Sequence, residues 1–144
     1  MTARRILRRD ERGAGAVEFA LALPVLVTMI YGIFEFSQLY EANASMQHAL
    51  GEGARLATLC IPNTASSTGC TAPTDDAITA KENAKLFGPK GGVFNVSTPA
   101  TVGTYKTLTI TYTRTMNFLF FRGPQIVLSR SKEVYVAAPA APAT

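Results

Sequence analysis

One carboxylate, Glu18, lies inside a long apolar stretch near the start of the chain, five residues after Gly13. The stretch runs from Ala14 to Phe34 and is long enough to cross a bilayer as a helix. A charged side chain in hydrocarbon is costly, so one that is present there is a candidate for function. The alternative is that Glu18 lies near the membrane interface and reaches water. The interval between Gly13 and Glu18 is therefore the first feature to explain.

The two cysteines, Cys60 and Cys70, are separated by nine residues. This spacing differs from a Cys-x-x-Cys redox pair, and without accompanying histidines it does not predict a zinc site. In an oxidising compartment the pair would form a disulfide that closes a short loop and contributes about 2–3 kcal/mol. Two free thiols are the alternative.

Catalytic side chains are scarce in this sequence. The single histidine, His48, falls on the polar side of an expected helix, and Asp75 and Asp76 suit a helix N-terminus better than an acid–base pair. No Ser-His-Asp set and no metal-ligand spacing can be assembled. We therefore expect no enzyme, no metal, no other cofactor and no small-molecule substrate.

Positive charge is concentrated before the apolar stretch. Residues 1–13 carry five arginines against two acids, whereas the rest of the chain is almost neutral. Basic residues beside a span mark its cytoplasmic side, which indicates a membrane protein rather than a nucleic-acid-binding one. A secretory signal cleaved at Ala42-Asn43-Ala44 is the alternative, but the apolar core is longer than such signals require.

The patterns predict an α+β fold. A helix from about residue 16 to 59 would have a transmembrane half and an amphipathic half, which packs on a small antiparallel sheet. Its buried stripe is expected at Leu39, Ala42, Met46, Ala49, Leu50, Gly53 and Ala57, and its solvated stripe at Glu41, Ser45, His48, Glu52 and Arg55. Pro24 predicts a bend in this helix. A second helix is expected over 74–87, and strands over 93–97, 105–115 and 125–136.

Four large apolar residues lie in the connection between the last two predicted strands: Phe118, Leu119, Phe120 and Phe121. Either they cap the core, or they form a contact patch for a membrane or a partner. The tail, residues 137–144, contains Pro139 and Pro142 and is expected to be disordered.

Gly13-Ala-Gly-Ala-Val-Glu18-Phe19 resembles the processing site of type IV-like prepilins, and its continuation Ala-Leu-Ala-Leu-Pro24 is closer to the TadE-like family of tight-adherence (Flp) pilus assembly. The distal order of a threonine-rich strand, an aromatic turn and a closing strand also resembles that family. The resemblance implies that a prepilin peptidase removes a basic leader, residues 1–13, by cutting between Gly13 and Ala14. Glu18 and Phe19 would serve recognition and helix positioning.

The implied molecule is a pilin-like minor pseudopilin of the bacterial inner membrane. Residues 14–35 would form the transmembrane segment, with a cytoplasmic N-terminus, and residues 36–136 a periplasmic domain, which could also enter an extracellular pilus. Its implied partners are the prepilin peptidase, other pilins or minor pseudopilins and the pilus assembly platform. The alternatives are an unprocessed membrane-anchored periplasmic binding or adhesion domain and a type II secretion pseudopilin.

Overall fold

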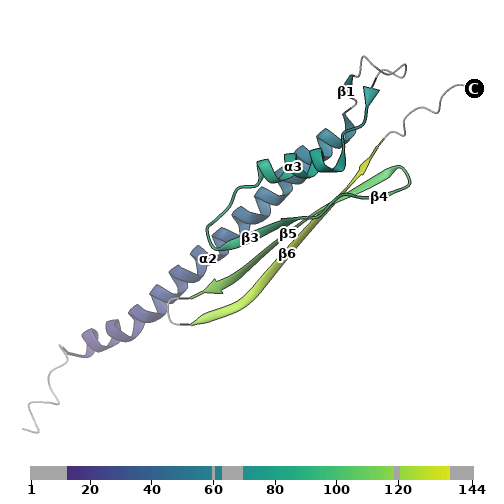
Figure 1. Cartoon of the computed structure of the whole chain (residues 1–144). Coiled ribbons are helices and arrows are strands. Elements are labelled where there is room, and N and C mark those ends of the chain that lie inside the picture. The colour runs from purple at the N-terminus through teal and green to yellow at the C-terminus, as the bar shows by residue number, and fades with distance from the viewer. Residues whose placement is uncertain (1–12, 60, 63–69, 119–120, 137–144) are drawn as a thin grey trace, which may run out of the picture.

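A long helix packed against a small antiparallel sheet forms the protein, as the computed structural model shows (Figure 1). The structure describes residues 13–59, 61–62, 70–118 and 121–136. The predicted α+β class is confirmed. The elements in chain order are α2 (Ala14–Thr58), β1 (Ile61–Pro62), β2 (Cys70–Thr71), α3 (Asp75–Lys85), β3 (Gly92–Val96), β4 (Ala100–Val102), β5 (Tyr105–Asn117) and β6 (Arg122–Tyr135).

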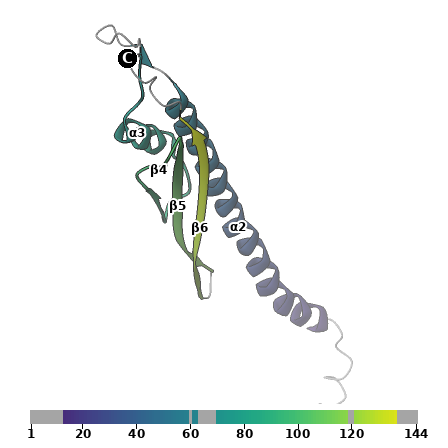
Figure 2. The same cartoon turned by 90° about the vertical axis from the view of Figure 1, so that its right-hand side faces the viewer.

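Helix α2 is one uninterrupted element of 45 residues. At 1.5 Å per residue it is about 68 Å long, and its N-terminal half projects beyond the sheet (Figures 1 and 2). Pro24 lies inside it, and the Thr28 hydroxyl donates a hydrogen bond of 2.7 Å to the Pro24 carbonyl. The predicted helix is confirmed. The bend expected at Pro24 stays a prediction.

Strand β5 is the centre of the sheet. Strand β6 pairs with it antiparallel along its length, from Tyr105 opposite Tyr135 to Asn117 opposite Arg122. Strands β3 and β4 pair antiparallel with successive parts of β5. The three longer strands were predicted, but β4 was not, because three residues are too few to show an alternating pattern.

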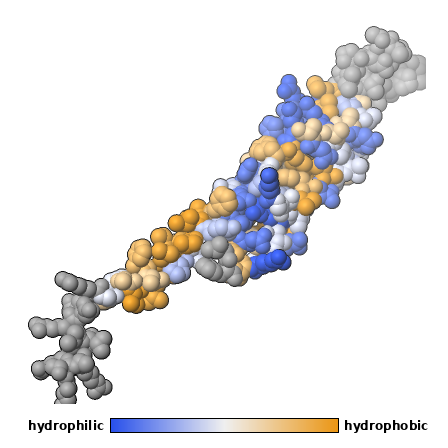
Figure 3. Space-filling view, turned by 60° about the vertical axis from the view of Figure 1, so that its left-hand side comes forward, coloured by the Kyte–Doolittle hydropathy of each residue, from blue (hydrophilic) through white to orange (hydrophobic). Residues whose placement is uncertain are grey.

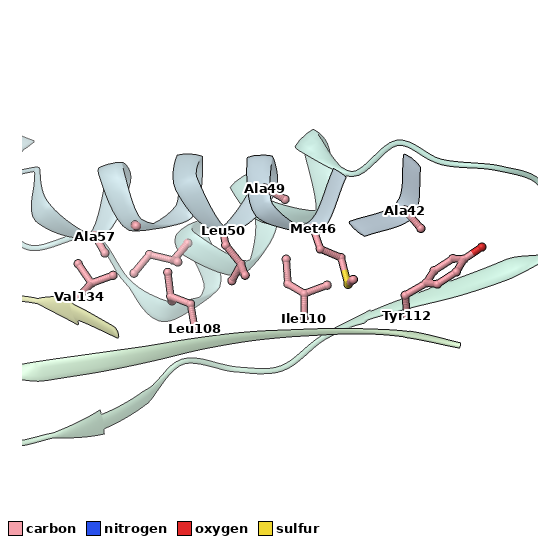
Figure 4. Close-up of a cluster of buried hydrophobic side chains, with 11 residues drawn as sticks. Ala42, Met46, Ala49, Leu50, Ala57, Leu108, Ile110, Tyr112 and Val134 are labelled. Carbon is pink, nitrogen blue, oxygen red and sulfur yellow. The ribbon is translucent and has the colours of Figure 1, made fainter. Parts of the chain in front are cut away.

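The core lies between α2 and the inner face of the sheet (Figure 4). From Leu108 to Arg114 of β5 the buried residues alternate with half-buried threonines, as the period of two predicts. The expected buried stripe of α2 is confirmed except at its first member, Leu39, which is half-buried. The labelled side chains of Figure 4 that form the core are Ala42, Met46, Ala49, Leu50 and Ala57 from α2, and Leu108, Ile110, Tyr112 and Val134 from the sheet.

The prediction that Ser45 belongs to the solvated stripe of α2 is wrong. Ser45 is fully buried, and its hydroxyl accepts a hydrogen bond of 2.8 Å from the backbone N–H of Phe87. The segment after α3 folds back over this side of α2, which a helical pattern alone does not predict. Exposed His48 lies beside Phe87, with ring centroids 6.3 Å apart.

Helix α3 covers a second side of α2. The Thr74 hydroxyl caps it by accepting a hydrogen bond of 3.2 Å from the Ala77 N–H, and two acids follow in the first turn, as predicted. The helix ends at Lys85, two residues before the predicted end. Its inward side chains are Ile78 and Glu82, both fully buried.

Candidate functional site

The predicted cleavage site lies at the point where α2 begins. Gly13 precedes the first helical residue, Ala14, with φ −83° and ψ −23°, and no side chain caps the helix there. A Cβ added at Gly13 would meet no described atom within 4 Å. Packing against the described part of the chain therefore does not demand a glycine at this position. The rest of the predicted leader, residues 1–12, lies outside the described residues.

Glu18 and Phe19 lie one turn further along α2. Both are exposed, and Phe19 is one of many large apolar residues on this half of the helix that face outward. Glu18 follows Ala14 by four residues, so the two lie on the same face of the helix. The structure thus groups Gly13, Ala14 and Glu18 at one end of the molecule, away from the other predicted site residues.

The N-terminal half of α2 has an apolar surface that the described residues leave largely uncovered. Its most apolar 18-residue window is completely unburied, and Figure 3 shows hydrophobic residues along this projecting part. Length and composition are those of a helix that can cross a membrane. In water, an exposed apolar surface of this extent would favour aggregation. The structure therefore supports membrane anchoring through α2.

A buried ion pair, which the sequence analysis missed, lies where the apolar half of α2 ends. Glu35 is 3% exposed and Arg114 of β5 is 7% exposed. Nη2 of Arg114 lies 3.1 Å from Oε2 of Glu35 and donates to Oε1 at 3.3 Å, while Nη1 donates to the side-chain oxygen of Gln38. The sequence contains a pattern that could have predicted this pair. Arg114 shares the core-facing period of Leu108, Ile110 and Tyr112, and a buried arginine needs a partner.

The aromatic turn of the β5–β6 hairpin reaches the same region. The rings of Phe118 and Phe121 stack with centroids 4.8 Å apart, and the Phe118 N–H donates to the Phe121 carbonyl at 2.9 Å. A Cβ added at Gly32 of α2 would lie 4.0 Å from the Phe118 ring. Phe118 is half-buried, and Phe121 is exposed. The other two members of the predicted patch, Leu119 and Phe120, lie outside the described residues.

The predicted disulfide cannot be placed, because Cys60 lies outside the described residues. Strands β1 and β2 flank the loop that it would close, and Pro62 pairs with Cys70 across them. This register sets Cys70 opposite Pro62, two residues after Cys60, so the bridge between Cys60 and Cys70 stays a prediction.

We predict that protein recovered from an oxidising compartment is lighter by the two thiol hydrogens than the same protein after reduction. We also expect Cys60→Ser to lower the free energy of unfolding by about 2–3 kcal/mol. Intact-mass analysis before and after reduction checks the first result, and urea unfolding the second. An unchanged mass would show two free thiols.

Comparison with protein families gives a match to the segment that carries the predicted cleavage site. The family model described as TadE-like protein matches residues 13–55, a segment that begins at Gly13 and covers nearly all of α2. No significant match is found among curated proteins or solved structures. The match confirms the resemblance to the TadE-like family at the segment that carries Gly13, Glu18 and Phe19. Residues 13–55 are therefore a TadE-like segment, and its family connects this chain with tight-adherence (Flp) pilus systems.

Proposed function

We propose that this chain is a minor pseudopilin that acts in assembly of a tight-adherence pilus. In this proposal a prepilin peptidase cuts between Gly13 and Ala14 on the cytoplasmic side of the membrane, and Ala14 becomes the new N-terminus. Residues after the span then lie in the periplasm, where they meet other pseudopilins or the assembly platform. The main support for this proposal is the spacing of Gly13 and Glu18 at the exposed start of a TadE-like helix.

The surroundings of Gly13 support cleavage there. The position is open, so a larger side chain would fit without disturbing the described fold. A glycine at this point is then best explained by an external requirement. A peptidase must bring its catalytic groups close to the backbone, and the absence of a Cβ permits that approach. Ala14, with its small side chain, continues the accessible surface on the other side of the bond.

Glu18 suits a role after cleavage. The new amine at Ala14 would lie one helical turn from the Glu18 carboxylate, and a cation beside a carboxylate makes its burial in an apolar medium tolerable. Because Glu18 is exposed on the isolated chain, the amine of an adjacent subunit can also approach it. Either pairing would fix the depth of α2 among neighbouring helices.

The domain attached to α2 supports a minor rather than a major subunit. Resemblance implies that major pilins of this system are short and nearly all helix, whereas here a sheet and a second helix pack directly on α2. The C-terminal half of α2 forms one face of the core, and the same helix continues without interruption into the apolar half. Movement of the anchor in the membrane would thus move the domain with it.

The test is the mature N-terminus. In cells that contain the prepilin peptidase we expect intact-mass analysis to show a chain that starts at Ala14, and in cells without it a chain that keeps residues 1–13. Gly13→Val should leave the leader in place in both strains. Gly51→Val is the matched control, because Gly51 of α2 is also open but lies outside the segment that resembles the processing site. An uncleaved wild-type chain in peptidase-containing cells would contradict the proposal.

A further inference from the structure

We propose that the tip of the β5–β6 hairpin inserts into the lipid interface and gives the domain a second membrane contact beside α2. The tip is defined here by Phe118 and Phe121. This inference needs α2 to span a membrane, but it is independent of cleavage after Gly13 and of which side the domain occupies.

The depth of the tip follows from its neighbour on α2. Phe118 packs beside Gly32, which lies two residues before the apolar stretch ends at Phe34, or about 3 Å along the helix. If residues 14–34 lie in hydrocarbon, Gly32 lies at its edge. The ring of Phe118 must then lie at that edge as well, because it is next to the helix there. Figures 1 and 2 show the hairpin running down along α2 towards the projecting half.

The chemistry of the tip fits a lipid interface better than water. Phe121 is 57% exposed although it is large and apolar. Near Gly32 on α2, Ile33, Phe34 and Phe36 are exposed too, so this level of the helix also presents apolar side chains. The next residue after the turn, Arg122, is exposed and can reach lipid phosphates, as arginines do at membrane surfaces.

Two contacts hold the residues next to the tip at this level of α2. After a register shift between Thr115 and Asn117, the ladder between β5 and β6 ends at the pair of Asn117 and Arg122, immediately before the turn. Four residues before Phe118, Arg114 is tied to Glu35 of α2, so the strand and the helix are joined just above the tip. Glu35 is the first charged residue after the apolar stretch. Because its carboxylate is buried against Arg114, it does not face the lipid unpaired.

Phe118 and Phe121 could instead pack on a second copy of this chain. The bilayer is the occupant that the position beside Gly32 favours, because lipid surrounds α2 at that level. A second copy could cover these rings only if it presented an apolar surface at the same depth in the membrane as Gly32. The experiment below distinguishes the two.

The chain contains no tryptophan, so one introduced residue reports its own surroundings. Three positions have the same exposure, 57%: Leu26 in the apolar half of α2, Phe121 at the tip and Tyr135 at the far end of β6. Each is replaced by tryptophan in the full chain, which is reconstituted into phosphatidylcholine vesicles with brominated acyl chains. Vesicles of ordinary phosphatidylcholine are the reference.

We expect Leu26→Trp and Phe121→Trp to lose most of their fluorescence in the brominated vesicles, and Tyr135→Trp to keep it. Quenching of Leu26→Trp alone would overturn the inference while leaving α2 in the membrane. A blue-shifted but unquenched Phe121→Trp would also overturn it, in favour of packing on a second copy. Absence of quenching at Leu26 would remove the premise that α2 spans the bilayer. Correct folding of each variant is checked by its circular dichroism spectrum.

Discussion

Arg114→Ala is expected to lower the free energy of unfolding by about 3–5 kcal/mol. The substitution removes the cation that faces Glu35, whose carboxylate is 3% exposed and lies 3.1 Å from Nη2. A buried carboxylate without its partner keeps the cost of leaving water but loses the attraction that offset it. The full chain in detergent micelles can be unfolded with urea and followed by circular dichroism of the sheet.

A matched control is present in the same sheet. Arg130 of β6 also connects the sheet to α2, with its Nε donating to the Asn43 side-chain oxygen at 2.8 Å, but it is exposed. Exposed polar links of this kind are worth at most about 1 kcal/mol, so Arg130→Ala should have a much smaller effect. If both variants lost the same free energy of unfolding, burial of the Glu35–Arg114 pair would not be what makes Arg114 important for stability.

Replacing both partners separates the cost of an orphaned charge from the value of the pair. The double variant Glu35→Leu with Arg114→Met puts apolar side chains of similar size at both positions. Buried ion pairs replaced in this way often give neutral or improved stability. We therefore expect the double variant to recover most of what Arg114→Ala loses. A double variant as unstable as Arg114→Ala would point to the Gln38 hydrogen bond or to packing as the main contribution.

Local patterns predicted the parts of the fold whose period is regular. The alternation in β5 and the stripe of small and apolar residues in α2 both repeat over many residues, and the structure buries both as expected. Ser45 shows where such a pattern fails. It lies on the polar side of α2 by spacing alone, but Phe87, 42 residues away in sequence, contributes the N–H that makes its burial possible.

The Glu35–Arg114 pair was missed for a related reason. The partners are 79 residues apart in sequence, and they meet only because β5 packs along α2 in the folded chain. The period of two places Arg114 on the inner face, but it does not say which residue of the helix lies opposite. For the cleavage site the situation is reversed. Gly13, Ala14 and Glu18 are close in sequence, so the resemblance of this short segment to prepilin processing sites carried the prediction, and the fold adds their exposure.

A second buried carboxylate, Glu82 of α3, leads to the other large prediction. Its side chain is fully buried against α2, where a Cβ on Gly53 would collide with the carboxylate. Neither carboxylate oxygen has a hydrogen-bond partner among the described residues. Loss of hydration therefore raises the pKa of Glu82 from 4.5 to about 7. The neighbouring residue, Lys81, directs its Nζ to Oε2 of Glu52 at 3.8 Å, and both of these side chains are partly exposed.

The sign of the effect follows from the two pKa values. Below pH 4.5 Glu82 is protonated in both the folded and the unfolded chain, so it adds no pH dependence. Between pH 4.5 and 7 the unfolded chain releases the proton first, and stability falls as the pH rises. Above pH 7 the loss is complete and amounts to about 3 kcal/mol, the equivalent of the difference between the two pKa values.

Glu82→Gln keeps the size of the side chain but removes its titration. We expect the variant to be more stable than the wild type at pH 8 by up to about 3 kcal/mol, reduced by the cost of a buried amide, and the gain to shrink as the pH falls to 4.5. Urea unfolding of the full chain at several pH values measures this. Glu41→Gln is the control, because Glu41 is exposed on α2 and its loss should change stability little at any pH. A difference between Glu82→Gln and wild type that is the same at pH 5 and pH 8 would mean that the carboxylate of Glu82 reaches water in solution, and that α3 does not close over α2 as tightly as its contact at Gly53 indicates.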